Sequence, residues 1–170
     1  RRIIDDHARA TRRAIEVGFD AVEVHLGHNY LASSFLSPKI NHRKDSWGGS
    51  LERRAEFARR ILQAVGEAAD GRIAVLAKMN MADGVPGGLW LDESLLFAQM
   101  LERKLRQRFR RLGQPEHRDE VLRFLDVGDE ASDQEAVEER LEFLPVGRQL
   151  VGGSEGGDQR NVDPLVAILV

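Results

Sequence analysis

Three side chains able to donate hydrogen bonds or protons stand close together in the stretch HLGHNY, namely His25, His28 and Tyr30. Two neutral imidazoles can donate hydrogen bonds to one substrate oxygen and polarise it. A phenol, with a pKa of about 10, is a weak proton donor that suffices when the acceptor is a developing carbanion. The residue types therefore indicate a site for reducing an α,β-unsaturated carbonyl compound.

A lysine is predicted to lie near these three side chains. Lys78 comes near the end of a second apolar segment, RIAVLAKMN, and could hold an anionic cofactor or substrate beside the two imidazoles. The residues alone leave the source of the hydride open.

A metal site is an alternative interpretation of the histidines. His25 and His28 are three residues apart, and His42 lies further on. Zinc takes three or four ligands, usually with carboxylate or thiolate help, and Gly27 interrupts any helix that would bring the first two imidazoles to one face. We therefore expect no metal here.

The second half of the polar stretch, NHRKDSWGGS, favours a structural role. Asn41, Arg43 and Asp45 have side chains that can satisfy the backbone of their own loop. Ser50 is a plausible N-cap for the helix that follows. For His25, His28 and Tyr30 this interpretation is weaker, because hydrogen-bonding groups at the mouth of a sheet are an unusual choice for a core.

The elements that must position these groups alternate along the chain. Apolar periodicity predicts helices over 4–17 and 51–69 and a third opening at Asp92, with strands over 19–26 and 72–80. Gly18 is a stop signal for the first helix. Alternating helices and strands favour parallel strands with helical crossovers, in an α/β sheet or barrel.

Each predicted strand has one wholly apolar face and one that turns polar toward its carboxyl end. The apolar faces carry Val22 and Val24 in the first strand, and Val75, Ala77 and Met79 in the second. The other face of the first strand carries Ala21, Glu23 and His25. The other face of the second strand carries Ala74, Leu76, Lys78 and Asn80. Ligands of α/β folds bind at the carboxyl ends of strands, so His25 and Lys78 are placed for binding.

Composition narrows the function class. The formal net charge of −3 gives no general attraction to nucleic acid, and the basic run at 103–111 is more typical of a solvated helix face. No segment approaches the roughly 20 apolar residues of a membrane span. The chain has no cysteine and the N-terminal residues lack the apolar region of a signal peptide, so we expect a cytoplasmic protein that acts on a small molecule.

The character of the chain changes after residue 102. A basic run is followed by acidic residues 113–144 with helical patches, then by a Gly-rich stretch and the strand-like LVAILV. We interpret 1–102 as one unit and 103–170 as a charged, largely helical C-terminal extension.

The stretch from GFDAVEVHLGHNYLASSFLSPKINHRKDSWGGSLERRAEF to VLAKMNMADGVPGGLWLDESLLFAQMLE, over roughly residues 4–102, resembles the Old Yellow Enzyme family of FMN-dependent NAD(P)H:flavin oxidoreductases and ene-reductases. The resemblance implies a (β/α)₈ TIM barrel that binds FMN at its C-terminal face. It also implies that NAD(P)H reduces the flavin, which passes hydride to an activated alkene.

The resemblance also implies residue roles. His25 and His28 would hold the carbonyl or nitro oxygen of the substrate, with His25 also close to the cofactor. Tyr30 would protonate the carbon opposite the hydride, and Lys78 would stabilise reduced FMN. Asn29 stands where the family usually has Gly, but Asn tolerates left-handed backbone, so we expect the turn that aims Tyr30 to survive.

The resemblance covers about two of eight barrel units, and such a barrel takes roughly 200 residues or more. The sequence is therefore interpreted as a barrel fragment whose tail arose by a reading-frame change or a fusion. The alternative to an FMN enzyme is a non-catalytic remnant or small α/β interaction domain.

Overall fold

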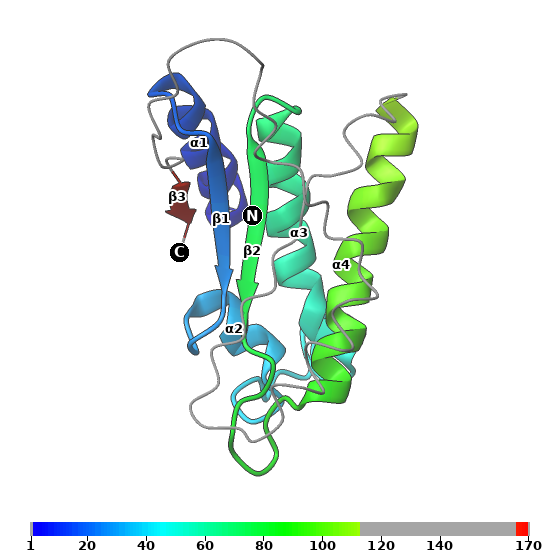
Figure 1. Ribbon diagram of the computed structural model, residues 1–170. Helices are drawn as coiled ribbons and strands as arrows, with labels where there is room; N and C mark the ends of the chain where they lie inside the picture. The colour runs from blue at the N-terminus through cyan, green and yellow to red at the C-terminus, as the bar shows by residue number, and fades with distance from the viewer. Residues whose placement is uncertain (1, 113–165, 170) are drawn as a thin grey trace, which may run out of the picture.

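The computed structural model describes residues 2–112 and 166–169 (Figure 1). Helices and strands alternate in the order expected from the sequence, with one short extra helix between the first strand and the second long helix. The elements are α1 (Arg2–Glu16), β1 (Ala21–Leu26), α2 (Leu31–Leu36), α3 (Leu51–Ala69), β2 (Ala74–Met79), α4 (Leu91–Leu112) and β3 (Val166–Leu169).

The strands form a parallel sheet in the order β2-β1-β3, which confirms the parallel α/β arrangement. The carboxyl ends of β1 and β2 point to the same end of the molecule, where α2 and the loop after β2 lie (Figure 1). The strand-like segment at the end of the sequence is β3, and it pairs with β1 from Ala21 beside Val166 to Val24 beside Leu169.

Helix α4 continues past residue 102 to Leu112. The change in composition at residue 103 therefore falls inside a helix and not at the end of an element. The acidic and Gly-rich parts of the predicted extension, residues 113–165, lie outside the described residues.

One face of the sheet forms the core. Val22, Val24 and Leu26 of β1 are at most 1% exposed, and the apolar residues of β2 alternate with half-buried ones in the predicted pattern. Helix α3 packs against β2, α1, α2 and α4, and its buried stripe includes the predicted residues Leu51, Ala55, Ala58, Leu62 and Val65. The apolar faces predicted for both strands and for α3 are confirmed.

The loop between α2 and α3 holds itself together, as expected for NHRKDSWGGS. The Asn41 amide donates to the carbonyl oxygens of Phe35 (2.6 Å) and Trp47 (2.7 Å), while its own oxygen accepts the Arg43 N–H at 3.2 Å. Asp45 accepts the Trp47 N–H and pairs with the Arg43 guanidinium. Ser50 occupies the N-cap of α3 with extended backbone, as predicted, although within the described residues its hydroxyl makes no hydrogen bond to the helix amides.

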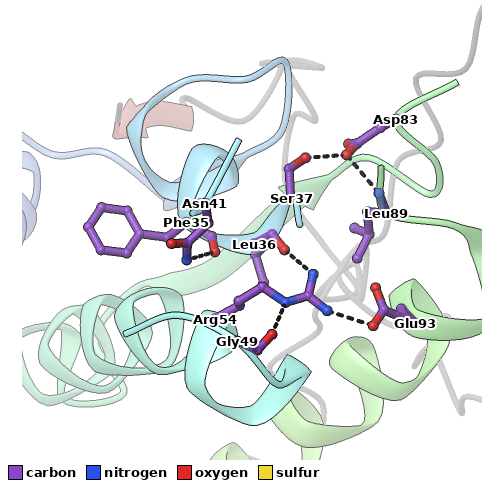
Figure 2. A network of polar contacts seen from close by, with 9 residues as sticks. All are labelled: Phe35, Leu36, Ser37, Asn41, Gly49, Arg54, Asp83, Leu89 and Glu93. Atoms are coloured by element: carbon purple, nitrogen blue, oxygen red, sulfur yellow. Dashed lines mark hydrogen bonds and ion pairs between the residues drawn. The ribbon is translucent and has the colours of Figure 1, made fainter. Parts of the chain in front are cut away.

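A buried arginine joins this loop to two helices (Figure 2). Arg54 of α3 is 3% exposed and donates to Gly49 O (3.0 Å), Leu36 O (2.5 Å) and Glu93 Oε1 (2.6 Å). One guanidinium thus satisfies a carbonyl at the end of α2, another before α3 and a carboxylate in the first turn of α4. A guanidinium can do this because its five N–H donors are fixed in a plane.

Replacing Arg54 by Met should destabilise the fold by about 3 kcal/mol, because Glu93 loses its partner and two carbonyls lose their donor. Urea unfolding followed by circular dichroism measures the change. Arg53→Met is the matched control, since Arg53 is the exposed neighbour in the same helix turn and its loss should change stability by less than about 0.5 kcal/mol. Equal effects of the two substitutions would contradict the anchoring role.

Candidate active site

His25 and Lys78 project from neighbouring strands to the same side of the sheet. They are directly paired in the parallel register of β1 and β2, and paired residues point to the same face. His25 is 8% exposed, whereas Lys78 is half-buried. The structure therefore brings together the two residues that the sequence placed at the strand ends.

The turn after β1 is built from left-handed backbone. His28 has φ 55° and Asn29 has φ 56°, so two consecutive non-glycine residues lie in the left-handed region. The chain closes with Tyr30 N–H donating to Gly27 O at 3.2 Å, and the Ser33 hydroxyl reaches back to the same oxygen at 2.8 Å. Asn29 thus has the left-handed backbone that asparagine was expected to tolerate here.

This turn gathers the three predicted rings. The centroid of the His25 ring lies 4.8 Å from that of His28 and 5.3 Å from that of Tyr30. His28 is exposed and Tyr30 is 54% exposed, whereas the His25 ring between them in these contacts is buried. The grouping of His25, His28 and Tyr30 inferred from the sequence is present, and their chemical roles stay predictions.

The environment of His25 favours its neutral form. Burial lowers its pKa from the ordinary 6.5, and the nearby His28 and Lys78 lower it further by repulsion of positive charge. A neutral imidazole carries one N–H donor and one acceptor nitrogen. At neutral pH His25 can therefore donate one hydrogen bond to a ligand oxygen without adding charge to the site.

The described residues offer no support for a metal centre. Within 2–112 and 166–169, no group of three or more His, Cys, Asp or Glu side chains could hold an ion. His42 belongs to the self-bonded loop and is exposed. Over the same residues, no helix is long and apolar enough to cross a membrane.

Three polar residues that hold the segments after the strands in place were given no role from the sequence. Asn80 accepts the His28 N–H at 3.0 Å. Asp83 accepts the Ser37 hydroxyl at 2.6 Å and the Leu89 N–H at 2.7 Å, and Figure 2 shows these two bonds. Arg54 is the third. Its position on the apolar stripe of α3 was a usable signal, because an arginine among buried residues needs partners.

The pKa of His25 should lie below 6.5 when its imidazole is titrated by NMR in the full chain. Lys78→Met should raise this pKa by removing a nearby positive charge, whereas Lys39→Met should leave it unchanged. Because the pKa of His25 is lower in the folded than in the unfolded chain, the unfolded chain takes up the proton first as the pH falls. The contribution of His25 to the free energy of unfolding is therefore fully present above about pH 6.5 and is lost as the pH falls below that value. A pKa at or above 6.5, or one insensitive to Lys78, would refute this picture.

Known proteins resemble part of this chain. A 4,4'-dithiodibutanoate disulfide reductase of Rhodococcus erythropolis is 58% identical over 100 residues, which are 59% of this chain and 25% of the relative. An NADPH dehydrogenase of Bacillus subtilis is 37% identical over 99 residues, 58% of this chain and 29% of the relative. The chain thus spans about a quarter of the length of these curated relatives.

Solved structures of reductases also align with part of this chain. A 2-naphthoyl-CoA reductase complex aligns with a TM-score of 0.58 at 35% identity, covering 59% of this chain and 15% of that one. Morphinone reductase with tetrahydroNAD aligns with a TM-score of 0.53 at 31% identity, covering 60% and 29%. Residues 1–113 match the NADH:flavin oxidoreductase / NADH oxidase family, and the chain belongs to that family, which confirms the resemblance stated from its sequence.

Proposed function

We propose that this chain carries the substrate-binding and proton-donating part of an FMN-dependent NAD(P)H oxidoreductase of the ene-reductase type. The observation that carries the proposal is the ring cluster of His25, His28 and Tyr30 beside Lys78 at the carboxyl ends of two parallel strands. Membership of a flavin oxidoreductase family supports it. The substrate class is an activated alkene such as an enone.

The side chains present fit the cofactor. Reduced flavin is an anion, and Lys78 supplies a cation on the face that it shares with the uncharged N–H donor of His25. Lys78 would hold the flavin ring, with His25 close to it. When bound, FMN supplies two-electron redox chemistry between NAD(P)H and the substrate.

The imidazoles would bind and polarise the substrate. Hydrogen bonds from His25 and His28 to its carbonyl or nitro oxygen withdraw electrons from the conjugated carbon. A neutral His25 suits this role because it donates without protonating the oxygen, and its burial strengthens its hydrogen bond.

Tyr30 would supply the proton. Its phenol is more than half exposed and lies against His25, so it can reach a carbon of a substrate whose oxygen the imidazoles hold. The phenol must regain a proton from solvent after each turnover, which its exposure permits.

A disulfide is a second candidate substrate, favoured by the 58% identity to a reductase named for 4,4'-dithiodibutanoate. The same donors suit that reaction, since cleaving a disulfide with NAD(P)H and a proton yields two thiols. Tyr30 would then protonate the departing thiolate.

Tyr30→Phe should slow the oxidation of reduced, FMN-loaded protein by an enone by about 10²-fold or more, because proton delivery is lost. Flavin reduction by NAD(P)H should stay close to wild type. Stopped-flow absorbance of the flavin measures both half-reactions, and Leu31→Ala, which alters the exposed neighbour of Tyr30, is the matched control.

Equal loss of both half-reactions in Tyr30→Phe would contradict the proton-donor role. A wild-type protein that oxidises its flavin with 4,4'-dithiodibutanoate but not with an enone would replace the alkene proposal by the disulfide one. Reactivity with neither substrate would refute both.

A further inference from the structure

The turn that carries His28 and Tyr30 is held from the neighbouring strand. The His28 N–H donates to Asn80 Oδ1 at 3.0 Å, and Asn80 directly follows β2. The same oxygen lies only 2.8 Å from where a Cβ on Gly27 would stand. Gly27 is therefore required because the Asn80 side-chain amide approaches it so closely. It is not required for its own backbone angle, since the φ of Gly27 is not positive.

The backbone of this turn needs such support. His28 and Asn29 both have left-handed φ, a conformation that side chains disfavour and that surrounding structure must enforce. Ser33 secures the turn from the helix side by donating to Gly27 O and Tyr30 O. The bond from Asn80 comes from the end of the neighbouring strand and acts on the amide of the first left-handed residue.

We propose that Asn80 is a positioning residue that fixes this left-handed turn and thereby holds the rings of His28 and Tyr30 against His25. The effect of Asn80 on catalysis rests on the proposed function, whereas its effect on the conformation of the turn does not. Asn80 would act through the backbone of His28 and would touch neither substrate nor cofactor.

The structure supplies a matched control. The segments after β1 and β2 are joined a second time where the Ser37 hydroxyl donates to Asp83 Oδ2 at 2.6 Å. This bond lies at the far end of α2, away from the turn. Ser37→Ala thus loosens the same pair of segments without touching the left-handed residues.

The test measures magnetisation transfer between the rings of Tyr30 and His25 by NMR in the full, ligand-free chain. Tyr30 is the single tyrosine, so its ring signals are unambiguous. We expect Asn80→Ala to lose the transfer and Ser37→Ala to keep it. Asn80→Asp should also keep it, because a carboxylate oxygen can accept the same amide hydrogen.

The proposal is overturned if Asn80→Ala keeps the transfer or if Ser37→Ala loses it equally. Should Asn80→Ala fail to fold, Gly27→Ala and Asn80→Asp decide the matter. Gly27→Ala pushes a methyl group against the Asn80 oxygen and should lose the transfer, while Asn80→Asp should retain it. Retention in Gly27→Ala would then refute the proposal.

A second readout separates this inference from the proposed function. In FMN-loaded protein, Asn80→Ala should slow flavin oxidation by an enone while sparing flavin reduction by NAD(P)H, and Asn80→Asp should restore the rate. Loss of ring contact in Asn80→Ala, with no enone reduction by wild type, would sink the proposed function and leave the positioning role standing. An unchanged oxidation rate in Asn80→Ala would overturn the positioning role in catalysis.

Discussion

The parallel register of β1 and β2 is the constraint on which the site depends. It pairs His25 with Lys78 and puts both on the face opposite the core residues Val24 and Ala77. A slip of one residue would turn the whole polar face of a strand into the core. The buried apolar faces under α3 therefore fix the register, and the register fixes which groups a ligand meets.

The turn after β1 and the loop after α2 have different roles. The turn at Gly27–Asn29 presents chemical groups and uses disfavoured backbone to do so, with bonds from Ser33 and Asn80 to hold it. The loop after α2 satisfies its own backbone and is tied to α3 and α4 through Arg54. A rigid scaffold around an exposed, polar turn is the arrangement expected of a ligand-binding loop.

Much of the fold could be predicted because its signals are local. The helix over 51–69 and the alternating faces of both strands follow from periodicity, and the ring cluster follows from three residues on one short turn. The bond from Asn80 to His28 joins residues 52 apart in the sequence, and no spacing pattern reports such a contact. The pairing of β3 with β1 likewise depends on a tertiary contact, although LVAILV itself was predicted to be a strand.

Binding of FMN is the most direct test of the central claim, that His25 and Lys78 form a flavin-facing site at the strand ends. Titration of the full chain with FMN, followed by quenching of flavin fluorescence, measures it. The account predicts saturable binding that Lys78→Met weakens and Lys39→Met does not. No saturable binding, or equal affinity in wild type and Lys78→Met, would contradict it.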